Sequence, residues 1–187
     1  MSNPLRDGAG YKIIGCRLGN TRSRGLLLKS DNGLVQGNVI EGCGMSAVSR
    51  GPKYCWGEAD YVHNVTVVGN TLRENGRAGY GGAAILVHGD GAMGSRNITV
   101  KDNRMYSNFQ GDVDVAWADG VAITGNTFRG PPAPPVGAEP PPISVRDARN
   151  VRVGGNQIKT PDAYARQSIP VEANVLRLTH DFGMPDK

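Results

Sequence analysis

Hydrophobic and polar positions alternate in short segments along this chain. In the segment 64–72, NVTVVGNTL, the apolar Val65 and Val67 flank the polar Thr66. Alternation with a period of two is typical of a β-strand with one buried face, whereas a helix repeats its apolar positions about every 3.6 residues. The Gly69-Asn70 pair that follows favours a bend, because both residue types tolerate left-handed backbone angles.

The same segment recurs along the chain at uneven intervals of 22 to 33 residues. Uneven spacing indicates a solenoid whose strands have a constant length and whose corners accept insertions. When the copies are aligned on Asn70, the equivalent residues are Cys16, Asn38, Asn103, Asn126 and Asn156.

Three columns of this alignment are almost entirely apolar and are predicted to face the core. They are the columns of Val65, Val67 and Leu72, and the positions between them are mixed, as expected of a solvent-facing side. The core columns read Tyr11, Gly33, Val65, Ile98, Val121, Val151; then Ile13, Val35, Val67, Val100, Ile123, Val153; then Leu18, Ile40, Leu72, Met105, Phe128, Ile158.

The Asn column predicts a ladder in which the amide of one coil bonds the amide of the next. A second short apolar strand follows each copy, at 26–28, 46–48, 84–87, 113–115, 143–145 and 169–171. Six rungs with at least two strands each predict an all-β fold, a single-stranded right-handed parallel β-helix of about six coils.

The predicted organisation is a leader over 1–10, a β-helix over 11–174 and an end segment over 175–187. A β-helix must cover the apolar surface and unpaired backbone of its first coil, and ten residues are too few for a cap. We therefore expect either that the chain is the C-terminal part of a longer β-helix or that it self-associates through this open coil.

Composition adds little about partners. Of 187 residues 27 are Gly, about twice the usual share, and the net charge of +4 is scattered along the chain, so neither a nucleic-acid nor a membrane partner is expected. Cys16, Cys43 and Cys55 lack metal-binding spacing and are expected to be thiols. We expect a soluble chain and no cofactor; the compartment stays open, and a secreted or periplasmic parent protein is compatible with the sequence.

Two consecutive corners are expanded, at 50–63 and 88–96, and stacked coils should place them side by side. An exposed aromatic ring beside carboxylates suits a saccharide, because the ring packs on the apolar face of a sugar. A loop folded on itself would explain the same residues. The candidate substrate-binding residues are Tyr54, Trp56, His63 and His88, and the candidate catalytic residues are Glu58, Asp60 and Asp90.

Glycoside hydrolysis needs two carboxyl groups, about 5–5.5 Å apart for retention and about 6.5–9.5 Å for inversion of configuration. Glu58 or Asp60 with Asp90 could meet either distance. Asp112 and Asp114 share a strand face, but no basic residue is recognisable beside them, so lyase chemistry ranks lower.

The segments RGLLLK (24–29), GLVQGN (33–38), GPKYCWGEA (51–59) and NVT (64–66) resemble later coils of the α-galactosidases of glycoside hydrolase family 110 and their β-helix relatives. The resemblance implies inverting exo-galactosidase chemistry without a metal or organic cofactor, with Glu58 matching a family acid. The paired aspartates of that family have no match in this sequence.

The sequence therefore supports a carbohydrate-active β-helix of the α-galactosidase type that binds a saccharide or polysaccharide. Two alternatives stay open: a non-catalytic scaffold that self-associates through the open coil, and a saccharide-binding fragment without turnover.

Overall fold

The structure, a computed structural model, describes residues 8–52, 61–79, 82–130, 140–159 and 175–180. In these residues the chain forms β-strands and no helix, and every strand pair is parallel. Each of the first five coils contributes one short strand to each of three sheets, which confirms the predicted all-β parallel β-helix.

The three sheets are named here A, B and C in the order in which a coil visits them. Sheet A contains β1 (Lys12–Ile14), β4 (Leu34–Gln36), β7 (His63–Val68), β10 (Ser95–Lys101), β13 (Ala118–Thr124), β16 (Arg149–Gly154) and β18 (Leu176–His180). Sheet B contains β2 (Arg17–Gly19), β5 (Val39–Glu41), β8 (Thr71–Arg73), β11 (Arg104–Tyr106), β14 (Thr127–Arg129) and β17 (Gln157–Ile158). Sheet C contains β3 (Leu26–Leu28), β6 (Val48–Arg50), β9 (Ile85–His88), β12 (Val113–Ala116) and β15 (Ile143–Arg146).

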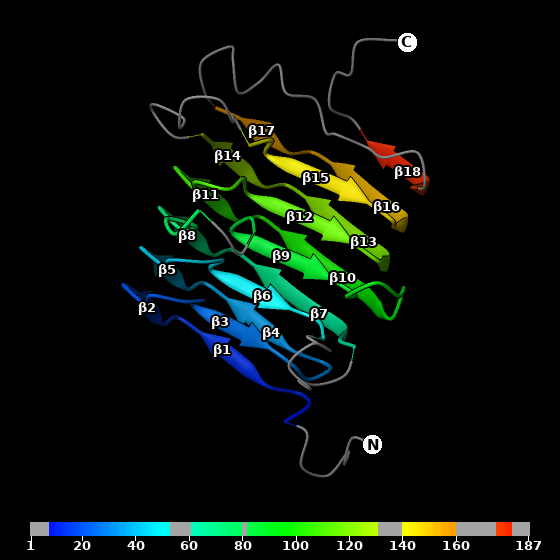
Figure 1. The fold of residues 1–187 in the computed structure, drawn as a ribbon, viewed down its shortest axis with the longest axis horizontal. Helices are drawn as coiled ribbons and strands as arrows, with labels where there is room; N and C mark the ends of the chain where they lie inside the picture. The colour runs from blue at the N-terminus through cyan, green and yellow to red at the C-terminus, as the bar shows by residue number, and fades with distance from the viewer. Residues whose placement is uncertain (1–7, 53–60, 80–81, 131–139, 160–174, 181–187) are drawn as a thin grey trace.

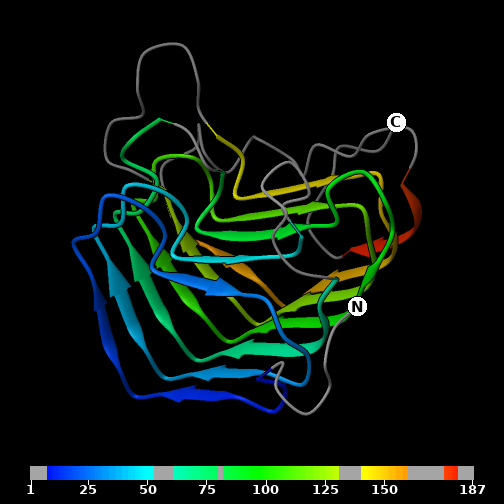
Figure 2. The ribbon, with the colours of Figure 1, turned by 60° about the horizontal axis from the view of Figure 1, so that its bottom comes forward.

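The coils stack in chain order from β1 to β18 (Figure 1). When the molecule is turned by 60°, the three sheets are seen to enclose a common interior (Figure 2). The sequence predicted at least two strands per coil, and the structure has three because the bend at Gly69-Asn70 divides the recurring segment into β7 and β8.

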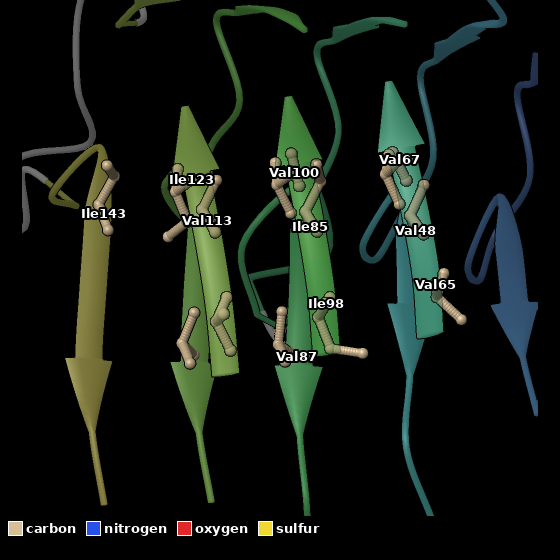
Figure 3. Packing of buried hydrophobic residues seen from close by; sticks show 14 of the residues in the cluster. Val48, Val65, Val67, Ile85, Val87, Ile98, Val100, Val113, Ile123 and Ile143 are labelled. Atoms are coloured by element: carbon tan, nitrogen blue, oxygen red, sulfur yellow. The ribbon is translucent and has the colours of Figure 1, made fainter. Parts of the chain in front are cut away.

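The interior is filled by the predicted core columns. Val67, Val100 and Ile123 of sheet A face Ile85 and Val113 of sheet C (Figure 3) and are completely or almost completely buried. The third column also lies inside, where Leu72, Met105 and Phe128 are inaccessible to solvent. The period-two pattern therefore predicted correctly which side of each strand is buried.

The predicted Asn ladder is present at the corner between sheets A and B. Asn70 Nδ2 donates to Asn103 Oδ1 over 2.9 Å and to the carbonyl of Val35 over 3.0 Å. Its backbone N–H donates to the same Asn103 oxygen, and its own Oδ1 accepts from Asn38. The pattern repeats from Asn38 to Asn156, and in the first coil Cys16 N–H donates to Asn38 Oδ1.

A second buried ladder, which the alignment did not predict, lies at the corner between sheets B and C. Asn75 Nδ2 donates to Asn108 Oδ1 over 3.1 Å, and Asn108 Nδ2 donates to Asp112 Oδ1 over 2.8 Å. Below them, Cys43 N–H donates to Asn75. Buried polar side chains thus join successive coils at two of the three corners, and exposed ones do so at the third, where Asn97 Nδ2 donates to Asn64 Oδ1.

The strands of sheet C are offset in places from their predicted positions. The strand predicted at 46–48 begins at Val48, and the one predicted at 84–87 begins at Ile85. The strand predicted at 169–171 lies outside the described residues. The offset matters at Arg50, because it places this residue in the inward column with Leu28 and Val87.

Arg50 has a buried guanidinium for which the described residues supply no hydrogen-bond partner. The residue is 1 % exposed, and none of its three guanidinium nitrogens makes a hydrogen bond. Burial lowers the pKa of Arg50 to about 9, and the nearby hydroxyl of Tyr11 opposes that shift. At neutral pH an unpaired cation therefore lies inside the coil, where it opposes folding.

We predict that Asn70→Ala lowers the free energy of unfolding by about 3 kcal/mol or more, since it removes several buried hydrogen bonds and leaves Asn38 groups unpaired. Chemical denaturation measures the change. The matched control is Asn64→Gly, which alters an exposed ladder residue that already has a φ of +54° and should cost less than about 1 kcal/mol. Equal losses in the two variants would contradict the role of the buried ladder.

We also predict that Arg50→Met raises the free energy of unfolding by about 1–4 kcal/mol, because an unpaired buried cation is replaced by an apolar side chain of similar length. The melting temperature should rise at neutral pH. A fall would show that the guanidinium makes a favourable interaction in solution.

Candidate functional site on sheet C

His88, Asp114 and Arg146 form a cluster on the outer face of sheet C. Arg146 holds Asp114 with two hydrogen bonds, Nη1 to Oδ1 over 2.8 Å and Nη2 to Oδ2 over 3.0 Å. His88 Nε2 lies 3.1 Å from Asp114 Oδ2 and 2.8 Å from Arg146 Nη2. The side chains are 17 %, 14 % and 28 % exposed respectively, so the cluster is shielded but remains open to a ligand.

The strand register brings these residues together across three coils. Ala116 of β12 pairs with His88 of β9 on one side and with Arg146 of β15 on the other. His88 and Arg146 are therefore two rungs apart, about 10 Å along the stack. Ala116 is fully buried and has only a methyl group, which leaves room for the two longer side chains to meet above it.

His88 Nε2 faces one acceptor and one donor at the same time. When Nε2 carries a proton it can donate to Asp114, and when it is unprotonated its lone pair can accept from Arg146. The two bonds cannot exist together, so the tautomer of the imidazole decides which of the two partners Nε2 bonds. A side chain that keeps a hydrogen bond in both states is suited to proton transfer.

Asp114 is held in its ionised form. Burial alone would raise the pKa of its carboxyl group, but hydrogen bonds and charge from His88 and Arg146 outweigh burial and lower the pKa below the usual value. Asp114 therefore offers an anionic acceptor at neutral pH and is unsuited to act as a general acid.

A depression of about 190 Å³ lies beside the cluster. Asp114 and Arg146 form part of its wall, with the polar side chains of Ser144 and Gln110 and the backbone around Gly82. On the other side of the cluster, the ring of Trp117 meets His88 edge to face, with centroids 5.9 Å apart and planes at 86°. The site thus combines a charged pair, neutral polar groups and an aromatic ring.

Four of the predicted site residues, Tyr54, Trp56, Glu58 and Asp60, lie outside the described residues. The described ends of the two expanded corners do meet, as stacking predicted. His63 Nε2 lies 3.0 Å from the carbonyl oxygen of Gly94, and a Cβ on Gly51 would collide with the carbonyl oxygen of His88. The corner at 50–63 therefore begins next to the end of β9.

His63 lies at this junction and is fully engaged. Its Nδ1 lies 3.1 Å from Asp31 Oδ2, its Nε2 faces Gly94, and its backbone N–H donates to Asp31 Oδ1 over 2.7 Å. Both ring nitrogens thus join neighbouring coils, and a substrate would have to displace one of these bonds.

Asp90, the predicted partner carboxylate, lies two residues beyond His88 in the turn that follows β9. It is half-buried and has a left-handed backbone with a φ of +51°. Since the turn starts at the cluster, Asp90 lies on the same side of the stack as His88.

Asp112 and Asp114 have different roles although they are two residues apart. Asp112 is buried and accepts a hydrogen bond from Asn108, as part of the second ladder. Asp114 instead meets a basic partner, Arg146, which the sequence analysis did not recognise. The signal was the pairing of sheet C, which puts Arg146 in the column of Ala116 and His88, next to the column of Asp114 on the same face.

Cys16 and Cys43 are free thiols, as expected, and Cys55 lies outside the described residues. Burial raises the pKa of Cys43, although hydrogen bonds from Thr21 partly offset the shift. Among the residues whose positions are given, no group of His, Cys, Asp or Glu could hold a metal ion. Over the same ranges no helix is long and apolar enough to cross a membrane.

We predict that Asp114→Asn lowers stability by about 2 kcal/mol at neutral pH, since it leaves a partly buried Arg146 without its counter-charge. Because folding lowers the pKa of Asp114, its contribution is fully present above about pH 4 and is lost as the pH falls through the folded-state value. The difference between wild type and variant, measured by urea unfolding, should therefore shrink below about pH 4. A difference that is constant over the acidic range would contradict this assignment.

Comparison with known proteins agrees with the fold. Residues 5–128 match the family model described as the right handed beta helix region. The match does not confirm the resemblance to family 110 α-galactosidases, and a comparison with curated proteins gives no match. Three all-parallel sheets in the structure and a family match over most of the chain lead to one conclusion: the chain belongs to the right-handed β-helix family.

Proposed function

We propose that this β-helix is carbohydrate-active and binds a saccharide on the outer face of sheet C, across the cluster of His88, Asp114 and Arg146, from the depression on one side to Trp117 on the other. The observation that carries the proposal is the combination of a bidentate carboxylate–guanidinium pair with an aromatic ring at one partly shielded site. Saccharide hydroxyls need both hydrogen-bond donors and acceptors, and the apolar face of a sugar ring packs on aromatic side chains.

The polar groups around the depression offer both kinds of partner. Asp114 is an anionic acceptor, Arg146 has N–H groups beyond those that hold Asp114, and Ser144 and Gln110 can each donate and accept. Trp117 is half-buried and leaves part of its indole accessible next to His88. A neutral sugar fits this set better than a strongly charged ligand, since the charges of Asp114 and Arg146 largely cancel.

Hydrolysis by the α-galactosidase type of mechanism is the reaction that the sequence resemblance favours. Such a reaction needs a protonated carboxyl group as well as a carboxylate. Asp114 stays ionised, so in this proposal the acid is Glu58, with Asp60 or Asp90 as the second carboxyl group. His88, held by Asp114, would orient a hydroxyl of the bound sugar.

Binding tests the site directly. We predict that Trp117→Ala weakens the binding of galactose-containing oligosaccharides about tenfold in calorimetric titration, because the stacking surface is lost. Trp117→Phe should retain most of the affinity, since it keeps an aromatic ring. The matched control is Tyr106→Ala, on the outer face of sheet B, which should bind a neutral oligosaccharide like wild type. If Trp117→Ala and wild type bind equally, the saccharide lies elsewhere.

Turnover is tested separately, on a panel of α- and β-linked galactosides and plant polysaccharides with Glu58→Gln alongside. Hydrolysis that disappears in the variant would support the enzymatic proposal. Binding without hydrolysis of any substrate would support the saccharide-binding alternative and refute the hydrolase.

A further inference from the structure

The outer face of sheet B carries two columns of side chains that continue from coil to coil. The interior column of this sheet is apolar, so the residues on either side of it in each strand face outward. The first outward column reads Arg17, Val39, Thr71, Arg104, Thr127 and Gln157, and the second reads Gly19, Glu41, Arg73, Tyr106, Arg129 and Lys159.

In the part of this face formed by β2, β5 and β8, positive and negative side chains are paired. Arg17 and Arg73 lie on either side of Glu41 and both bond to its carboxylate. Hydrogen bonds from Arg73 and Arg17 lower the pKa of Glu41, which keeps the carboxylate ionised between the two cations. An anionic ligand would meet a counter-charge that is already in place here.

In the part of this face formed by β11, β14 and Lys159, the outward columns hold basic side chains and no acidic one. Arg104, Arg129 and Lys159 are exposed, and in the part of the chain that the structure describes none of their side chains forms an ion pair or a hydrogen bond. They come from β11, from β14 and from the residue after β17, which are three successive coils. The positive charges therefore extend along the stack over about 10 Å.

These cations surround a depression of about 300 Å³. Its walls include Arg104, Tyr106, Thr127, Arg129 and Lys159, and none of these described lining residues carries a carboxylate. Guanidinium groups bind carboxylates and sulfates through paired N–H donors, and Tyr and Thr add neutral hydrogen-bonding groups. The lining is thus complementary to an anion that also has hydroxyl groups.

We infer that this depression on sheet B binds an anionic polysaccharide, whose carboxylate or sulfate groups lie against Arg104, Arg129 and Lys159. The regular rungs of a β-helix present cations at a fixed spacing, which suits a polymer with regularly spaced charges. Single-stranded nucleic acid fits less well, because Tyr106 is the one aromatic residue among the described lining residues and successive bases require successive stacking surfaces. The site is separate from the depression on sheet C and does not depend on the function proposed there.

The test measures binding of polygalacturonate and dextran sulfate, with neutral dextran and poly(dT) as comparisons, over a range of salt concentrations. The variant combines Arg104→Gln, Arg129→Gln and Lys159→Gln. We expect binding to one or both acidic polysaccharides that weakens about tenfold or more in this variant and depends less on salt. Preference for polygalacturonate would identify carboxylate as the recognised group, and preference for dextran sulfate would identify sulfate.

The matched control combines Lys12→Gln, Arg22→Gln and Arg152→Gln, three exposed residues outside sheet B, and removes the same net charge. It should bind like wild type, and circular dichroism should show that both variants keep the fold. Equal weakening in both variants would show that binding depends only on the net charge of the chain, which would contradict a binding site on sheet B. Absence of binding, or tighter binding of poly(dT) that depends on the same three residues, would also overturn it. Trp117→Ala should leave this binding unchanged.

Discussion

The hydrogen-bonded asparagines at the corner between sheets A and B are the constraint on which the rest of the structure depends. Each buried amide joins its own coil to the next through both the side chain and the backbone. A one-residue shift of any coil would leave several buried polar groups unpaired and would expose its core column. The ladder therefore fixes the register of neighbouring coils, and all positions on the outer faces follow from that register.

Both candidate sites follow from this fixed register. In a stack of similar coils, residues far apart in sequence lie in one line if they occupy the same column. His88 and Arg146 are 58 residues apart, yet their side chains meet because Ala116 separates them by a single small rung. On sheet B, the same geometry places Arg104, Arg129 and Lys159 in three successive coils. Outward columns accept many residue types, because their side chains do not pack in the core. A few polar residues in these columns are thus enough to form an extended site.

The repeat of residues 64–72 predicted the buried columns and the Asn ladder because both require the same residue type in every coil. Sheet C was predicted less accurately, since the corners before it vary in length and no residue repeats there as Asn70 does. His88 and Asp114 were singled out from the sequence, but Arg146 was not, because its place beside them depends on the pairing of β12 with β15. Arg50 was missed for the same reason: its strand lies two residues further along the chain than predicted, so a residue assigned to the corner at 50–63 belongs to the strand and is buried.

The central claim is that a saccharide binds on sheet C. The most direct measurement is a nuclear magnetic resonance titration of the ¹⁵N-labelled chain with a neutral galactose-containing oligosaccharide, following the indole N–H of Trp117 and the ring nitrogens of His88. The account predicts that these signals and the backbone amides of β12 and β15 shift together and saturate at one ligand concentration, while the signals of sheets A and B stay in place. Saturable shifts confined to another face, with those of Trp117 and His88 unchanged, would contradict it.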